Sequence, residues 1–287
     1  MTLSPAEFFS RATTERTAVG PVRYAWRKFG EGPALLLIHG FPLSGFTWRK
    51  VLPQLAEHYT CYVPDLPGLG DTEWAEDTDF SWHGHTRGLM GLVDALGLRH
   101  YRVMGHDTGG TFARCLGLLD GARIEKIAII NSELPGHRPP WIPLYQKLMF
   151  APGAPAMFAA LLRSQLFLRS PMAFGGCFND LSLIEGDFRE HFVAPIVRDP
   201  RRMRGVQLYL RSLKWDVVDR LGHDHARLAM PVRLIWGADD PTFPLVDAYR
   251  MVRQLPHGSL VGIPGAKLMA HEEKPADVAR AVLQFFS

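Results

Sequence analysis

Short apolar runs alternate with longer amphipathic stretches along most of the chain. The run at 34–38 (Ala-Leu-Leu-Leu-Ile) is continuously apolar, which is typical of a strand buried on both faces of a parallel sheet. The same pattern predicts further strands at 22–26, 61–63, 101–104, 124–130, 232–236 and 259–263, and helices at 46–58, 81–96 and 109–119. Strands that alternate with helices in this way predict an α/β fold with a doubly wound, mostly parallel sheet.

The alternation stops between residues 130 and 231. This interval is rich in Pro, Phe, Leu, Met and Arg and predicts several helices without strands. Ligands of open α/β sheets bind at the carboxyl edge of the strands, so an insertion at that point is placed to cover a site. We therefore predict a core domain made of 1–132 and 228–287, and an inserted helical lid, or cap, at 133–227.

Composition and charge exclude several classes of function. The 287 residues carry 32 Lys and Arg against 29 Asp and Glu, a net charge of +3 without a long basic run, which argues against a nucleic-acid partner. The sequence has no HExxH, no CxxC and no phosphate-binding glycine loop with lysine. We expect no metal and no cofactor.

The cysteines and the apolar stretches indicate the compartment. Cys61, Cys115 and Cys177 are odd in number and far apart, so they fit neither a disulfide framework nor a zinc site. Residues 1–11 lack the apolar segment of a signal peptide, and the apolar stretch at 149–162 is too short and too broken by proline to span a bilayer. We expect a cytoplasmic protein without a membrane span.

The sharpest local motif is Gly-His-Asp-Thr-Gly-Gly at 105–110, between a predicted strand and a predicted helix. Its spacing is that of the G-x-S-x-G nucleophile elbow, with Asp107 where serine would stand. The glycines leave room for the sharp turn, and the helix N-terminus behind it favours an anionic carboxylate. An N-capping aspartate in an ordinary strand–helix turn is the structural alternative.

Two further motifs follow the ends of other strands. At 39–42 (His-Gly-Phe-Pro), the backbone N–H of Phe41 can join that of Thr108 in binding a developing oxyanion. At 236–241 (Trp-Gly-Ala-Asp-Asp-Pro), Asp240 is the acidic residue expected to orient a histidine, preferred to Asp239 because it directly precedes the turn proline. A simple turn aspartate is the alternative for Asp240.

Together these motifs, with Asp-Leu-Pro-Gly at 65–68 and Glu-Lys-Pro at 273–275, resemble the α/β-hydrolase superfamily. The resemblance is to its aspartate-nucleophile branch, the epoxide hydrolases and haloalkane dehalogenases, and covers nearly the whole chain. It implies an α/β-hydrolase fold in which Asp107 attacks a carbon atom to give an alkyl ester. Water activated by a histidine then hydrolyses the ester.

The chain departs from the family at that histidine. In the family it stands seven residues before the proline of the C-terminal motif, a place that Leu268 occupies here, beside Lys267. His271 is the nearest imidazole, and in relatives this second place often holds a non-catalytic histidine. We take His271 as the base, with a loop bent so that it lies between Asp107 and Asp240. The alternative is that the base is absent.

The resemblance also suggests residues that assist the leaving group. Epoxide hydrolases protonate the alkoxide with lid tyrosines, for which Tyr209 and Tyr145 are the candidates. Haloalkane dehalogenases bind the halide through a tryptophan after the nucleophile, where this chain has Thr108; Trp141 or Trp215 of the lid can substitute. We therefore predict an epoxide hydrolase, with a haloalkane or haloacid dehalogenase as the first alternative.

A second alternative is a non-hydrolytic or ligand-binding relative that lacks the catalytic histidine. In each case the expected partner is a small apolar organic substrate, which Trp141, Tyr145 and Tyr209 would contact. The sequence determines neither the substrate nor the stereochemistry of the reaction. It also leaves the oligomeric state open, and a homodimer is one of the states it allows.

Overall fold

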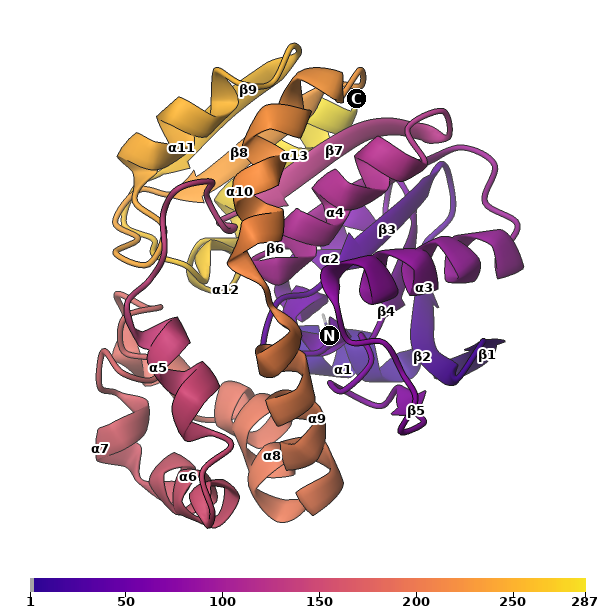
Figure 1. Ribbon diagram of the computed structural model, residues 1–287. Helices are drawn as coiled ribbons and strands as arrows, with labels where there is room; N and C mark the ends of the chain where they lie inside the picture. Colours follow the sequence, from indigo (N-terminus) through magenta and orange to yellow (C-terminus); the bar gives the residue numbers. More distant parts are fainter. Residues whose placement is uncertain (1–2) are drawn as a thin grey trace.

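The computed structural model describes residues 3–287 and contains one twisted sheet with helices on both faces (Figure 1). Its strands follow the order β1-β2-β4-β3-β6-β7-β8-β9, and β5 pairs with β2. Pairs from β4 through β9 are parallel, whereas β1, β2 and β5 pair antiparallel at one side. The strands are β1 Glu15–Val19, β2 Val22–Phe29, β3 Ala34–Ile38, β4 Thr60–Pro64, β5 Glu73–Trp74, β6 Tyr101–His106, β7 Ile124–Ile130, β8 Val232–Gly237 and β9 Gly258–Ile263.

The core lies between the central strands and the helices on each side. Leu35 to Ile38 of β3 have no exposed surface, as the continuous apolar run predicts. Helices α3 and α4 pack against each other on one face, while α13 contacts α2, β8 and β9. The helices of the core are α1 Pro5–Arg11, α2 Leu52–Leu55, α3 Trp82–Ala95, α4 Thr108–Leu119, α11 Leu245–Val252, α12 Ala270–Glu273 and α13 Pro275–Phe286.

Helices fill the interval between β7 and β8. They are α5 Trp141–Leu148, α6 Ala154–Arg163, α7 Gln165–Leu168, α8 Ala194–Arg198, α9 Pro200–Ser212 and α10 Trp215–Asp224, and the described chain has no strand between them. Figure 1 shows α5 to α9 gathered to one side of the sheet, with α10 returning to it beside α4. No helix of residues 3–287 is both long enough and apolar enough to cross a membrane.

The helix predicted at 46–58 is not continuous and ends earlier. The chain forms a 3-10 helix at Gly45–Lys50 and then the single turn of α2. Pro53 has no N–H to donate to the carbonyl four residues earlier, so a continuous α-helix through this stretch loses a hydrogen bond. The short strands β1 and β5 and the helices α1, α11, α12 and α13 were not predicted.

Close contacts around the turn from β6 to α4 hold this part of the core together. A Cβ on Gly109 would lie 2.1 Å from the carbonyl oxygen of Ile38, and one on Gly105 would lie 2.2 Å from the carbonyl oxygen of Gly109. Neither backbone oxygen can move without displacing a strand or helix. These glycines therefore fix how closely α4 approaches β3.

We expect Gly109→Ala to lower the free energy of unfolding by about 1–3 kcal/mol, because overpacking outweighs the better helix propensity of alanine. Urea unfolding followed by circular dichroism measures the change. The matched control is Gly262→Ala in β9, where an added Cβ meets only Leu245 at 3.8 Å. A variant at Gly109 as stable as the control would contradict the close-contact explanation.

Candidate active site

Asp107 stands on a strained turn at the carboxyl end of β6. Its backbone has φ 52° and ψ −126°, and it is the residue directly before α4. Positive φ is unfavourable for a residue with a side chain, and such strain persists only where surrounding contacts enforce it. Here the backbone N–H of Asp107 lies 2.8 Å from the carbonyl oxygen of Asn131. The turn thus has the conformation of a nucleophile elbow.

Backbone donors converge on the Asp107 carboxyl. The N–H of Phe41 donates to Oδ2 at 2.8 Å, and the backbone N–H of Thr108, the first residue of α4, lies close enough to lower the pKa of the carboxyl. A Cβ on Gly40 would lie 2.5 Å from Cβ of Asp107, so only glycine permits this approach. The structure therefore brings together the two donors predicted for an oxyanion hole. The Phe41 N–H binds an oxygen of Asp107 itself, where an ester carbonyl would lie.

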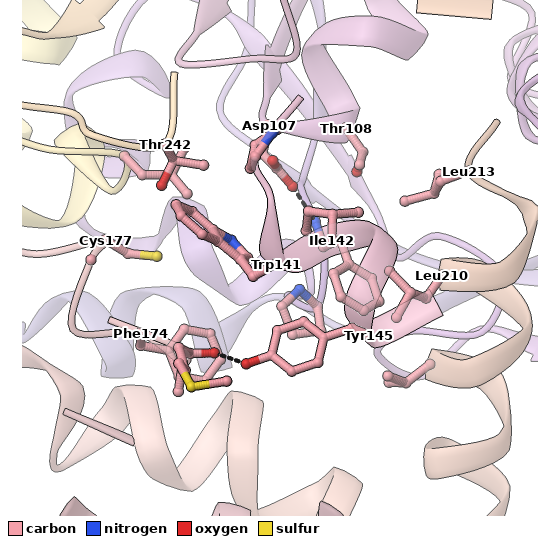
Figure 2. A pocket seen from close by; sticks show the side chains of 18 of the residues that line it. Asp107, Thr108, Trp141, Ile142, Tyr145, Phe174, Cys177, Leu210, Leu213 and Thr242 are labelled. Carbon is pink, nitrogen blue, oxygen red and sulfur yellow. Dashed lines mark hydrogen bonds between the residues drawn. The ribbon is translucent and has the colours of Figure 1, made fainter. Parts of the chain in front are cut away.

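Asp107 faces an apolar cavity of about 160 Å³ between the sheet and the inserted helices (Figure 2). The residues that line it include Phe41, Asp107, Thr108, Glu133, Trp141, Tyr145, Phe174, Cys177, Thr242 and Leu268. Most are apolar, which suits a small apolar organic molecule. The only carboxyl groups on this lining are those of Asp107 and Glu133, and no histidine within residues 3–287 lies on it.

The two predicted lid tyrosines are engaged elsewhere. The Tyr209 hydroxyl shares a hydrogen bond with Thr108 Oγ1 at 2.8 Å, and its ring stacks on Phe41 at 5.4 Å. Tyr209 is fully buried behind these residues and does not line the cavity. Tyr145 lines the cavity, but its hydroxyl donates to the carbonyl of Met172. Trp141 lines the cavity, and its contact with a substrate stays a prediction (Figure 2).

Asp240 lies beyond the end of β8, buried and near enough to Asp107 that its charge raises the pKa of that carboxyl. Its Oδ2 accepts a hydrogen bond from Asn131 Nδ2 at 2.7 Å, and its Oδ1 accepts one from the Thr242 N–H at 2.8 Å. Burial raises its pKa to about 7 despite these donors. Asn131 also accepts from the N–H of Gly237 at 2.8 Å, so it ties Asp240 to the strand ends.

The prediction that His271 lies between Asp107 and Asp240 is wrong. His271 is the second residue of α12, and its Nε2 shares a hydrogen bond with Thr47 Oγ1 at 2.7 Å. Its ring packs against Trp48 and His106, and its buried Nδ1 has no partner within residues 3–287. The loop does not bend so as to place His271 between Asp107 and Asp240, because α12 already begins at Ala270. The ring is held on the side of the 3-10 helix instead.

The position at which the family has its histidine does reach the cavity. Leu268 lines it, and the Leu268 carbonyl lies 3.1 Å from Nε2 of His106. Lys267 points elsewhere, since its Nζ donates to the carbonyl of Phe178 at 3.1 Å. The site therefore has an apolar side chain where the base would stand.

Glu133 is the cavity residue that the sequence analysis missed. It follows β7 by three residues and is 4% exposed, on the same carboxyl edge as Asp107. An acidic residue just past a parallel strand is the same signal that selected Asp240. It was overlooked because Glu133 was assigned to the start of the lid.

The two cavity carboxyls perturb each other. Burial raises the pKa of Asp107 well above its usual value, and the neighbouring Glu133 charge raises it further. Burial likewise raises the pKa of Glu133, against hydrogen bonds from Thr111 and Ser132 and the charge of Arg114. In residues 3–287, no three His, Cys, Asp or Glu side chains are grouped to hold a metal ion.

His271 gives a pH-dependent test of this arrangement. Burial lowers its pKa well below the usual 6.5, so the folded protein keeps the ring neutral where the unfolded chain takes up a proton. Its contribution to stability is thus complete above about pH 6.5 and is lost as the pH falls. Between pH 7 and pH 5, we expect wild type to lose about 2 kcal/mol of unfolding free energy relative to His271→Gln. Urea unfolding at each pH measures it, and a difference independent of pH would contradict a buried neutral imidazole.

The fold agrees with comparisons to known proteins. A family model described as "alpha/beta hydrolase fold" matches residues 33–275. A solved α/β-hydrolase fold protein from Burkholderia ambifaria superposes with a TM-score of 0.81 at 24% identity, covering 94% of this chain and 97% of that one. At this identity the superposition shows the fold alone.

Relatives by sequence carry different names. The chain is 29% identical to a soluble epoxide hydrolase of Corynebacterium sp. (96% of this chain, 97% of that protein) and 26% identical to haloalkane dehalogenase 2 of Mycobacterium tuberculosis (90% and 89%). It is 30% identical to the magnesium-chelatase 30 kDa subunit of Rhodobacter capsulatus (93% and 92%). Since the family model spans most of the sequence, the chain belongs to the α/β-hydrolase fold family.

Proposed function

We propose that the protein opens an epoxide by attack of Asp107, and that water then hydrolyses the resulting alkyl ester. The observation that carries this proposal is the position of Asp107 on the elbow, with its carboxyl facing an apolar cavity and Oδ2 held by the Phe41 N–H. The free oxygen, Oδ1, attacks a ring carbon. A carboxylate in its anionic form needs no base for that step.

The oxyanion hole serves the second half of the reaction. When water attacks the ester carbonyl carbon, negative charge develops on the oxygen that the Phe41 N–H already binds, beside the N–H of Thr108. Preorganised donors of this kind stabilise the transition state without further reorganisation. Hydrolysis regenerates the Asp107 carboxylate, in which one oxygen now comes from the water molecule.

The helices at 133–227 act in this proposal as a lid that keeps bulk water from the reacting carbon. Residues of α5, α6 and α7 supply apolar side chains to the cavity, among them Ile142, Phe158 and Phe167. An apolar cover strengthens the electrostatic effect of the few polar groups inside. It also selects substrates with small apolar substituents.

A haloalkane is the second candidate substrate, and Trp141 is the observation that favours it. The indole of Trp141 lines the same cavity as Asp107 (Figure 2). Its N–H is the kind of donor that binds a departing halide. An epoxide is preferred because the site also contains a second carboxyl group suited to proton transfer.

The transfer of oxygen from Asp107 tests the proposed function directly. We expect a single turnover in H₂¹⁸O, with enzyme in excess over styrene oxide, 1,2-epoxyhexane, 1-bromohexane or 1-chlorohexane, to give an alcohol product without ¹⁸O. The new oxygen then comes from Asp107, and the label enters the peptide that contains it. Mass spectrometry of product and peptide measures both, and halide release separates the two substrate classes.

Asp107→Ala is the matching variant. We expect it to lose at least about 10³-fold in turnover, because the covalent route is removed. The control, Asp239→Asn, changes an exposed carboxylate beyond the same sheet edge and should retain wild-type turnover. Product labelled in the first turnover, or turnover retained by a folded Asp107→Ala protein, would refute the aspartate nucleophile.

A further inference from the structure

The structure assigns Glu133 as the proton donor and acceptor of this site, in place of both the lid tyrosines and the missing histidine. This inference rests on the proposed function, since it supplies the acid and the base for the two half-reactions of Asp107. Glu133 lines the cavity together with Asp107, and no other carboxyl on its lining is available. It would therefore be a catalytic residue in direct contact with substrate.

The sheet brings the two carboxyls together. Strands β6 and β7 are parallel neighbours in which His106 pairs with Ile130, so the residues that follow both strands leave the same edge side by side. The Asp107 N–H lies 3.2 Å from the carbonyl oxygen of Ile130 and 2.8 Å from that of Asn131. The loop that carries Glu133 is thus bonded to the elbow itself.

Glu133 is held by one oxygen and leaves the other available. Its Oε2 accepts from Thr111 Oγ1 at 2.6 Å and from Ser132 Oγ at 3.1 Å. Within residues 3–287, no side chain donates a hydrogen bond to Oε1. A carboxyl fixed at one oxygen and free at the other is oriented for proton exchange with a molecule in the cavity.

A buried arginine sets the charge of the pair. Arg114 in α4 is fully buried, and its Nη2 donates to Thr111 Oγ1 at 2.7 Å and to the Glu133 carbonyl at 2.8 Å. Thr111 Oγ1 accepts from the guanidinium and donates to Glu133 Oε2, so it links the two groups. One buried cation beside the two buried carboxyls, with the charge of buried Asp240 near Asp107 as well, favours a single negative charge on the pair. The pair then keeps one proton.

That proton completes the first half-reaction. In the reactive form Asp107 is ionised and Glu133 is protonated. Oδ1 of Asp107 forms a bond to the epoxide carbon as the ring C–O bond breaks, and the oxygen that receives the electron pair takes the proton of Glu133. The products are a neutral ester of Asp107 with a free hydroxyl group, and a Glu133 carboxylate.

The same carboxylate drives the second half-reaction. Glu133 takes a proton from water as the oxygen of that water bonds to the ester carbonyl carbon. The tetrahedral intermediate expels the alkoxide and leaves Asp107 as a carboxylic acid. The alkoxide takes the proton of that acid and leaves as the diol. Asp107 ends as a carboxylate and Glu133 as an acid, so the site returns to its starting state and the net change is addition of water to the epoxide.

Glu133→Gln tests this role while keeping the size of the side chain and an oxygen that accepts from Thr111. We expect both half-reactions to slow: ring opening moderately, because the amide N–H of Gln can still donate to the alkoxide, and ester hydrolysis by roughly 10²–10⁴-fold, because the base is lost, so that a covalent adduct on Asp107 accumulates. Intact-mass measurement after incubation with styrene oxide detects the adduct. Glu133→Asp, which retains a carboxyl, should restore part of the hydrolysis, and Asp239→Asn should show no adduct.

The outcomes separate the two proposals. If Glu133→Gln turns over like wild type without an adduct, Glu133 has no catalytic role and the Asp107 proposal stands. If wild type itself gives ¹⁸O-labelled product in its first turnover, the Asp107 proposal fails. Should Glu133→Gln not fold, Thr111→Val provides the second test through the pH dependence of ester hydrolysis.

Thr111→Val removes a hydrogen bond that lowers the Glu133 pKa. Because the base must be ionised, the acidic limb of the ester-hydrolysis rate should move to higher pH; an unmoved limb would overturn the role of Glu133. The other ionisable groups around the pair are Arg114, Asp240, Tyr209 and Cys177. Thr111→Val leaves each of their side chains in place.

Discussion

The backbone strain at Asp107 is the constraint on which the rest of the site depends. A positive φ between a buried strand and a buried helix is tolerated only because the backbone of neighbouring strands approaches from both sides. Gly40, Gly105 and Gly109 leave the space for this approach. Its consequences are the exposure of the carboxyl to the cavity, the alignment of two backbone N–H groups with it, and the contact with the loop after β7.

The second consequence is electrostatic. By placing Asp107 against the β7 loop, the elbow brings it near Glu133, in surroundings where burial disfavours two charges. A family member with histidine at the position of Leu268 has a neutral base for water. Here Leu268 makes that part of the cavity apolar. Glu133 is then the group on the cavity lining that can exchange protons beside Asp107. The loss of the histidine and the presence of Glu133 are thus parts of one arrangement in our proposal.

Much of the fold follows from local patterns in the sequence. The run at 34–38 and the strand at 124–130 coincide with β3 and β7, because a strand buried on both faces needs uninterrupted apolar residues. The elbow at Asp107 was also predictable, since its glycines are needed by the turn itself. Short elements such as β5 were not, because two residues carry no periodicity.

The chemistry of the site was less predictable, because it depends on side-chain direction. His271 was chosen for its place in the sequence, yet Thr47 and Trp48 hold its ring away from the carboxyls. Tyr209 lies near Asp107 but presents its hydroxyl to Thr108. Glu133 depends on a contact between two loops that are distant in sequence, and only the pairing of β6 with β7 makes them neighbours.

The proton held between Asp107 and Glu133 can be observed by infrared difference spectroscopy. At neutral pH, wild type should show a stronger C=O stretch of protonated carboxyl than Glu133→Gln, because Asp107 ionises when it is the only carboxyl of the pair, whereas the partly protonated Asp240 contributes equally to both proteins. Asp239→Asn should keep the band. An identical protonated-carboxyl band in wild type and Glu133→Gln would show that the two groups do not share one proton, and would contradict the central role of the pair.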